Sequence, residues 1–202
     1  TDVIAELKDE IQHINEMVDR LLAIARYDNS KVIMHNERFS VNRLAASVIK
    51  SMSGLCQPGT FELKSQTGNI ELTADKVMIR QLLGILLDNA VKYTGDNKKI
   101  AITLEKIASS VKITVKDNGI GIPKKAKKHI FSDIYRAENA RQSQEEGTGF
   151  GLLQVQRIVK MLHGKITFCS EEGKGTTFIV TLPRTTTVAE PVSHESSLEH
   201  LA

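Results

Sequence analysis

Residues 75–94 read DKVMIRQLLGILLDNAVKYT, and this stretch decides the class of fold. The aspartate at its start can cap a helix, and the apolar positions that follow predict a buried helix over about 76–93. Near its end stand an amide, a lysine and a phenol, Asn89, Lys92 and Tyr93. A core helix has no structural need for that combination, so the end of this helix is a candidate binding site.

Two interpretations of this helix end are open from the residues alone. Asn89 could hold a magnesium ion through its side-chain carbonyl, a hard oxygen ligand of the kind that this metal prefers. Lys92 could then meet a phosphate, and Tyr93 could pack on a base or a sugar. Alternatively, these residues form a polar face that emerges at the C-terminus of the helix, where lysine is favoured anyway.

The rest of the chain predicts an α+β domain around this helix. Further helices are expected from a cap at Ser40 to about Gly54, and from Leu152 to a C-terminal cap at Gly164. Because helices and hairpins alternate irregularly, we expect a two-layer α/β sandwich, with a mixed, mostly antiparallel sheet covered by helices on one face. Apolar patterning predicts its strands over 61–64, 70–73, 100–107, 111–116, 165–170 and 176–182.

Two terminal regions are set apart from this domain, which we expect to span 31–184. In the first of these, residues 1–30, apolar side chains recur at steps of three and four, which predicts a long helix over 1–28 with one apolar stripe. Such a helix either joins a coiled coil or bundle, or packs on its own domain. Residues 185–202 are rich in threonine and serine, so we expect a disordered tail, and Leu198–His200 is typical of a cloning remnant.

Composition excludes several classes of function. Of 202 residues, 41% are hydrophobic and 25% are charged, which are ordinary globular values. The net charge of +3 does not indicate nucleic acid or an anionic membrane as a partner. No apolar run approaches the length of a membrane span, so we expect no direct contact with a membrane. Cys56 and Cys169 lie far apart without metal-ligand spacing, which suits a reducing compartment.

The segment Asp117–Pro123, DNGIGIP, directly follows an alternating strand. An Asn-Gly pair is typical of a tight hairpin turn, but the helix-like stretch 124–128 offers no partner strand, and its four lysines most simply form a solvated face. We therefore favour a second interpretation, in which Asp117 lies at a strand end and accepts a hydrogen bond from an adenine amino group. Gly119 and Gly121 would then let the backbone approach the base closely.

A third segment, 147–151, reads GTGFG and directly precedes a helix. Glycines before a helix N-terminus leave backbone N–H groups that can bind an anion. This is not a dinucleotide fingerprint, because polar residues 136–146 precede it in place of a strand. Nor is 173–176 a P-loop, because Phe168 occupies the required upstream glycine position. The order of features is more specific: an amide-bearing helix, a strand-end aspartate, a long polar segment over 118–148, a glycine cradle and a helix.

That order resembles the ATP-binding domain shared by histidine kinases, gyrase, mismatch-repair ATPases and a heat-shock chaperone, over about residues 36–183. The phenylalanine box is special to histidine kinases, and Met17–Asp28 is similar to the second helix of their dimerisation and phosphotransfer domain. The likeness rests on Asp88–Thr94 as the asparagine box, Asp117–Pro123 as the first glycine box, Ile130–Arg136 as the phenylalanine box, Gly147–Leu152 as the second glycine box and Gly173–Phe178 as the closing glycine-threonine turn.

The resemblance implies that the chain binds ATP and Mg²⁺. Asn89 would hold the metal and Asp117 the adenine amine, while Lys92 and Tyr93 would contact phosphate and nucleoside. Arg136 would steady the γ-phosphate, so that the expected catalytic residues are Asn89, Lys92 and Arg136. The other residues expected to contact the nucleotide are Gly119, Gly121, Ile122, Gly147, Thr148, Gly149, Phe150, Gly151, Leu152 and Thr176.

The chain departs from the family pattern in three places. Ile85 stands one turn before Asn89, where many members carry a polar residue, which removes support for a metal contact or a proton acceptor there. Ile134 replaces the second phenylalanine of its box and should alter the docking of the expected ATP lid, residues 137–148. No histidine lies where the phosphate acceptor is expected, so we expect a fragment that begins after the acceptor. The six histidines are His13, His35, His129, His163, His194 and His200.

The resemblance therefore implies the catalytic region of a sensor histidine kinase. Such a kinase transfers the γ-phosphate of ATP to a histidine of its own dimerisation domain, in a homodimer, for relay to an aspartate of a response regulator. We expect this fragment to be the cytoplasmic portion of an inner-membrane sensor and not to phosphorylate itself. The alternative is a degenerate nucleotide-binding or dimerisation module without kinase turnover. A conformational ATPase like gyrase is disfavoured, because the chain is short and lacks a transducer domain.

Overall fold

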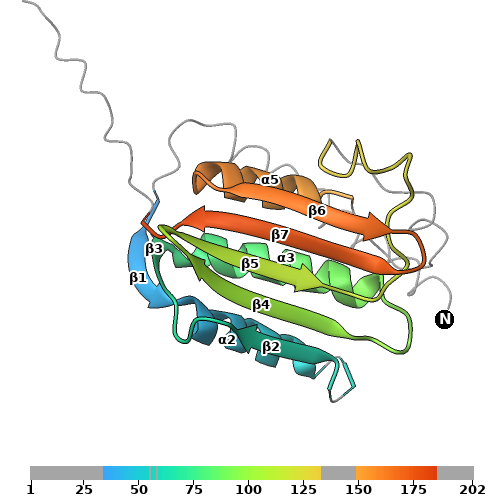
Figure 1. Ribbon diagram of the computed structural model, residues 1–202, viewed down its shortest axis with the longest axis horizontal. Helices are drawn as coiled ribbons and strands as arrows, with labels where there is room; N and C mark the ends of the chain where they lie inside the picture. The colour runs from blue at the N-terminus through green and yellow to red at the C-terminus, as the bar shows by residue number, and fades with distance from the viewer. Residues whose placement is uncertain (1–33, 55, 58, 133–148, 186–202) are drawn as a thin grey trace, which may run out of the picture.

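The computed structural model describes residues 34–54, 56–57, 59–132 and 149–185, which form three helices, a five-stranded sheet and a two-stranded sheet (Figure 1). The expected helix at 1–28, the lid and the tail lie outside these residues. In chain order the elements are β1 (Asn36–Ser40), α2 (Val41–Ser53), β2 (Phe61–Ser65), β3 (Glu71–Asp75), α3 (Lys76–Lys92), β4 (Ile100–Ile107), β5 (Ser110–Lys116), α5 (Gly151–Met161), β6 (Lys165–Glu171) and β7 (Gly175–Pro183).

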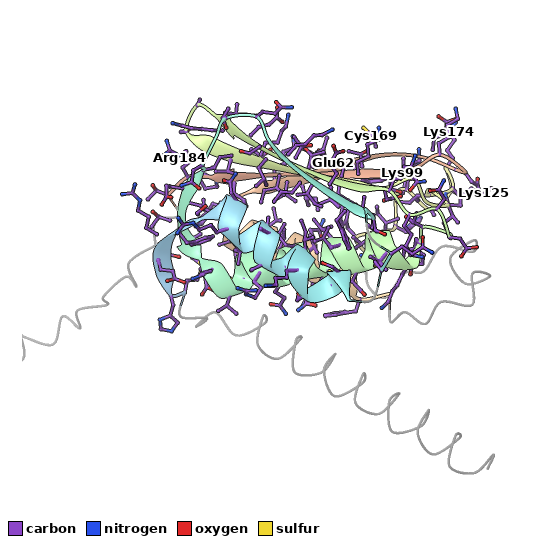
Figure 2. All side chains as sticks on the ribbon, turned by 90° about the horizontal axis from the view of Figure 1, so that it is seen from below. Glu62, Lys99, Lys125, Cys169, Lys174 and Arg184 are labelled. Carbon is purple, nitrogen blue, oxygen red and sulfur yellow. The ribbon has the colours of Figure 1, made fainter. Side chains whose placement is uncertain are left out.

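The larger sheet has the strand order β2-β4-β5-β7-β6. Only β2 and β4 run parallel, and the other three pairs are antiparallel. Figure 2 shows the helices on one side of this sheet, whereas Glu62 and Cys169 lie on the other side. The predicted fold class, a mixed and mostly antiparallel sheet covered by helices on one face, is confirmed.

The core lies between the sheet and the helices. Alternate residues of the central strands face the helices, so two of the three buried side chains of β4 lie in register with buried side chains of β5 and β7. α3 contributes a broad buried face, and each large side chain removed from water there stabilises the fold by about 1.5–3 kcal/mol. The fully buried side chains of α3 are Ile79, Leu82, Leu83, Leu86 and Leu87.

The two-stranded sheet of β1 and β3 meets the larger sheet just after the end of β7, which is an inner strand. The Thr73 amide donates to the Arg184 carbonyl at 2.9 Å, which connects β3 to the end of β7. The sequence analysis did not predict β1. The reason is that β1 carries a single buried apolar side chain, Phe39, so it has no apolar alternation to detect.

The caps predicted at two helix N-termini are confirmed. The Ser40 side chain accepts from the Arg43 amide, and the Asp75 side chain accepts from the Val77 and Met78 amides.

The predicted glycine cap at the end of α5 is wrong, because His163 occupies the left-handed position at φ +53. The Gly164 amide donates to the Val159 carbonyl at 2.8 Å and the His163 amide to the Lys160 carbonyl at 3.0 Å, which is a Schellman arrangement. Gly164 is required for space instead, since a Cβ there would lie 2.7 Å from the Thr181 carbonyl oxygen.

The lysine-rich stretch after Pro123 is not a helix. It forms successive turns, in which Ala126, His129 and Ser132 each donate to a carbonyl three residues earlier. Three of its lysines are exposed as expected, but the Lys127 ammonium group donates to the carbonyl of Ser170. That contact fixes the stretch against the end of β6.

The glycines after β5 are explained by contacts with the chain's own backbone. A Cβ on Gly119 would lie 2.2 Å from the Tyr93 carbonyl oxygen, and one on Gly121 would lie 2.1 Å from the Glu171 carbonyl oxygen. The sequence analysis explained these glycines by the approach of the backbone to a nucleotide base. The contacts with the chain's own backbone are sufficient to explain them without a base. They let three chain segments meet at one end of the sheet.

We expect His163→Gly to stabilise the protein by about 0.5–1 kcal/mol. Glycine adopts the left-handed backbone conformation without the steric cost that a side chain brings, but its greater conformational freedom in the unfolded chain offsets part of this gain. Chemical denaturation measures the change. His163→Ala is the control that keeps the left-handed cost, and equal stabilities of the glycine and alanine variants would contradict the assignment.

We expect Gly119→Ala to destabilise the protein by about 3 kcal/mol, because backbone rather than a movable side chain blocks the new methyl group. Gly84→Ala is the matched control, since a Cβ at Gly84, inside α3, meets nothing within 4 Å. Alanine there should stabilise the helix by up to about 1 kcal/mol. Two variants of similar stability in a urea titration would rule out the close approach at Gly119.

Candidate functional site

Asp117 is a buried carboxyl group at the end of β5, with only 8% of its surface exposed. Its Oδ1 atom accepts from the Gly119 amide at 2.9 Å and from the Thr176 amide at 3.0 Å. Burial raises the pKa of Asp117 above its ordinary value of 3.8, and these backbone hydrogen bonds oppose the rise. Among the described residues, no hydrogen bond to the second oxygen, Oδ2, is formed, so that oxygen is available to a ligand.

The hairpin interpretation of Asn118-Gly119 is wrong. Over the described residues 118–132 no strand follows β5, and the two neighbours of β5 in the sheet are β4 and β7. The Asn118 side chain instead accepts from the Lys99 amide at 2.8 Å and donates to the Asn97 carbonyl at 2.9 Å. Asn118 thus fastens the loop before β4 beside Asp117.

The C-terminus of α3 lies against the same segment. The Ile120 amide donates to the Tyr93 carbonyl at 2.9 Å, and the Tyr93 amide donates to the Asn89 carbonyl at 3.0 Å. Asn89 and Tyr93 are both half-buried. The Lys92 ammonium group lies 2.8 Å from Asp88 Oδ2, a pair spaced one helical turn apart. The structure therefore brings the end of α3 next to Asp117.

The start of α5 lies beside Asn89. A Cβ on Gly151 would lie 3.0 Å from Ile85 Cγ2 and 3.9 Å from Asn89 Nδ2, so the glycine allows the two helices to pack closely. Gly149 has a positive φ of +71, and the N-cap residue Phe150 is buried and forms no side-chain cap hydrogen bond. The first N–H groups of a helix are not bonded within it, so an anion near Asn89 could accept from them.

Thr176 and Ser170 complete this end of the sheet. The Thr176 side chain is buried, and its hydroxyl lies 2.9 Å from the Ser170 hydroxyl. Ser170 Oγ also accepts from the Ile122 amide at 2.8 Å and donates to the Gly175 carbonyl at 3.1 Å. No sequence pattern indicates this role for Ser170, because it depends on which strand end lies beside the glycine segment.

The described residues thus bring together most of the predicted site. Asn89, Tyr93 and Asp117 are joined through the backbone, and α5 begins next to them. Ile85 packs against α5, so the position where a polar residue was considered serves packing here. Arg136, Gly147 and Thr148 lie outside the described residues, as does Ile134, so their roles stay predictions.

Comparison with known proteins identifies the same kind of domain. Residues 74–186 match the family described as "Histidine kinase-, DNA gyrase B-, and HSP90-like ATPase". The chain is 33% identical over 175 residues to the signal transduction histidine-protein kinase ArlS of Staphylococcus epidermidis, covering 87% of this chain. It is 31% identical over 170 residues to ArlS of Staphylococcus aureus, covering 84%. The chain spans 38% of the length of these relatives.

Comparison with solved structures identifies the same kind of domain. The catalytic domain of histidine kinase ThkA superposes with a TM-score of 0.66 at 29% identity, over 76% of this chain and 98% of that one. Full-length ShkA, solved in complex with AMPPNP, has a TM-score of 0.76 over 93% of this chain and 39% of that one, and at 24% identity it supports the fold alone. The chain therefore belongs to the family of histidine kinase-, DNA gyrase B- and HSP90-like ATPases, and its curated relatives are histidine kinases.

Proposed function

We propose that this chain is the ATP-binding catalytic region of a sensor histidine kinase. The observation that carries the proposal is the geometry of Asp117. Two backbone N–H groups fix one carboxylate oxygen, and the other oxygen lacks a hydrogen bond among the described residues. A buried carboxyl group with an open oxygen is costly unless a donor reaches it, and an adenine amino group is such a donor.

The residues present fit Mg²⁺-ATP. Within the described part of the chain, no group of three or more histidine, cysteine or acidic side chains could hold a metal ion. A magnesium ion here would therefore be bound by the Asn89 carbonyl oxygen together with nucleotide phosphates, an arrangement common for this metal. Bound Mg²⁺-ATP would supply the transferable phosphoryl group and the charge of the metal.

The side chains would then act mainly by positioning. The N-terminus of α5 would donate N–H groups to phosphate, and Lys92 would supply a positive charge after separating from Asp88. Tyr93 would pack against the nucleoside, and Arg136 would contact the γ-phosphate. The isoleucine at position 85 offers no proton acceptor, so catalysis would rest on orientation and charge.

The expected partners follow from the kinase role. The phosphate acceptor would be a histidine of the kinase's own dimerisation domain, in a homodimer, and the next acceptor would be a response regulator. One structural neighbour, ThkA, was solved in complex with the response regulator protein TrrA. Both cysteines are free, which supports a cytoplasmic location. None of the described helices is both long enough and apolar enough to cross a membrane.

Mixing the chain with Mg²⁺-ATP and a separate dimerisation domain that carries the acceptor histidine should produce acid-labile phosphate on that domain. A domain with the acceptor changed to glutamine is the control and should stay unlabelled. ATP binding without transfer would favour the degenerate nucleotide-binding module. Phosphate release in the absence of an acceptor would favour an ATPase.

We expect Asp117→Asn to weaken ATP binding by about 10- to 150-fold, because a hydrogen bond to a charged group is lost. The asparagine carbonyl can still accept from Gly119 and Thr176, so the fold should be retained. Isothermal titration calorimetry measures the affinity, and circular dichroism checks the fold. An unchanged affinity would remove the adenine assignment.

The pH dependence of binding tests the same carboxyl group. ATP affinity should fall as the pH is lowered through the raised pKa of Asp117, beginning above the range of an ordinary aspartate. The free energy of unfolding depends on pH in the opposite direction. Because the folded chain binds this proton more tightly than the unfolded chain does, stability is lost as the pH rises through that pKa. Asp117→Asn removes both effects, and parallel pH profiles of the two proteins would contradict the assignment.

A further inference from the structure

Asp75 occupies the junction between β3 and α3 and is 7% exposed. Its Oδ1 atom accepts from the amides of Val77 at 3.0 Å and Met78 at 3.1 Å. These bonds satisfy two of the N–H groups that the first turn of any helix leaves without an intrahelical partner. One oxygen of Asp75 therefore fixes the start of α3.

The second oxygen of Asp75 binds a different part of the chain. Oδ2 accepts from the backbone amide of His35 at 3.0 Å, forty residues earlier in the sequence. Asn36, the next residue, pairs with Asp75 in the register of β1 and β3. The side chain of Asp75 thus connects the segment that leads into β1 directly to the first turn of α3.

The other end of α3 carries the proposed nucleotide site. α3 has 17 residues, which at 1.5 Å per residue is about 25 Å, and Asn89 lies in its last turn. Figure 1 shows β1 and β3 at one end of this helix and the end of β5 at the other. Because the buried face of α3 is close-packed, a displacement of one end is transmitted along the helix.

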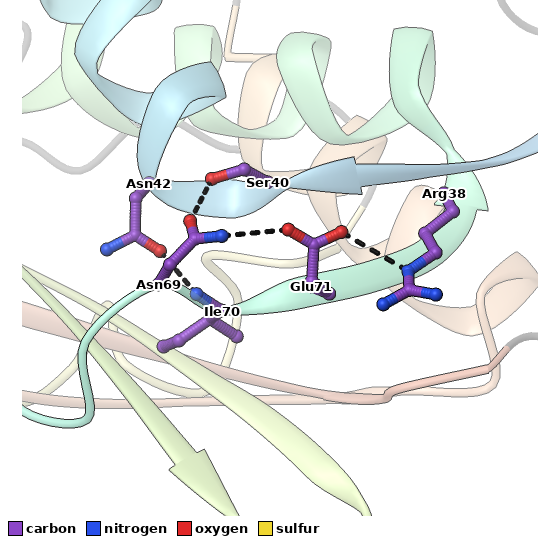
Figure 3. Close-up of polar contacts among 6 residues, drawn as sticks. All are labelled: Arg38, Ser40, Asn42, Asn69, Ile70 and Glu71. Carbon is purple, nitrogen blue, oxygen red and sulfur yellow. Dashed lines mark hydrogen bonds and ion pairs between the residues drawn. The ribbon is translucent and has the colours of Figure 1, made fainter.

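A second polar network at the same corner does not involve α3. As Figure 3 shows, Ser40 and Glu71 both bind Asn69, Arg38 binds Glu71, and the Ile70 amide donates to Asn42. This network holds the junction of β1 and α2 to the loop before β3. It provides a control in which a nearby contact is lost while the bonds of Asp75 are kept.

We infer that Asp75 is a positioning residue that couples the segment leading into β1 to the nucleotide end of α3. The inference rests on the proposed function, since it requires that nucleotide binds at that end. Nucleotide and the His35–Asp75 contact then stabilise each other. By linkage, the factor by which nucleotide strengthens the contact equals the factor by which the contact strengthens nucleotide binding.

Two variants break the contact, one from each side, and two further variants serve as controls. Asp75→Asn keeps one oxygen for the helix cap but replaces the second with an NH₂ group, which cannot accept from His35. His35→Pro removes the donor N–H, whereas His35→Ala keeps it and removes only an exposed imidazole. Glu71→Gln breaks the neighbouring network instead. The probe ligand is Mg²⁺ with the ATP analogue AMPPNP.

In the unaltered chain, saturating nucleotide should slow hydrogen exchange of the His35 amide by about fivefold, at the low end of typical couplings. Asp75→Asn should weaken AMPPNP binding by the same factor while amide exchange in the first turn of α3 stays slow. His35→Pro should weaken binding equally, and the double variant no further. His35→Ala and Glu71→Gln should bind as the unaltered chain does.

Two results would overturn the coupling while leaving the proposed function intact: AMPPNP binds without changing His35 exchange, or Asp75→Asn and His35→Pro both bind it with unchanged affinity. If the unaltered chain binds no AMPPNP, the proposed function fails and the coupling fails with it. If Asp75→Asn does not fold, His35→Pro decides the question alone, because it leaves the cap of α3 in place.

Discussion

The site depends on the close approach of backbone segments at one end of the sheet. Gly119 lies against the Tyr93 carbonyl, Gly121 lies against the Glu171 carbonyl, and a Cβ on Gly175 would lie 2.2 Å from the Asp117 carbonyl oxygen. Since no side chain fits at these three positions, backbone segments approach closely around the Asp117 side chain, which is buried. The burial of that carboxyl group, and with it the rise of its pKa, follows from the packing of glycines.

Enclosure alone would make Asp117 a poor acceptor, because a buried carboxyl group loses its hydration. Two backbone N–H groups on Oδ1 supply part of what water would have given, and they also fix the orientation of the group. The second oxygen then has a defined direction and lacks a hydrogen bond within the described chain. This combination of burial, orientation and one open oxygen favours a specific donor such as an amine over bulk water.

Much of this arrangement could be predicted from sequence, and the rest could not, for physical reasons. α3, β4 and β5 were predictable because each has a strong apolar pattern over many residues, and the Asp75 and Ser40 caps have local chemistry. β1 has one buried side chain and pairs with a strand some 35 residues away, so no local pattern marks it. The role of Ser170 and the left-handed conformation of His163 both depend on which segments meet in space. The glycines at 119 and 121 were recognised, but the neighbour that excludes a side chain there could only be seen in three dimensions.

Packing and chemistry are inseparable in α3. The helix provides most of the large, fully buried side chains of the helical layer, and the same element carries Asn89 near its end and is capped by Asp75 at its start. Ile85 shows the consequence most directly, because its side chain packs where Gly151 lets α5 approach, and that approach sets the distance between α5 and Asn89. A position that could have supplied a polar group to the site instead fixes where the site is. In the proposed function α3 would therefore hold groups in place rather than exchange protons, which suits phosphoryl transfer, a reaction that depends chiefly on positioning and charge.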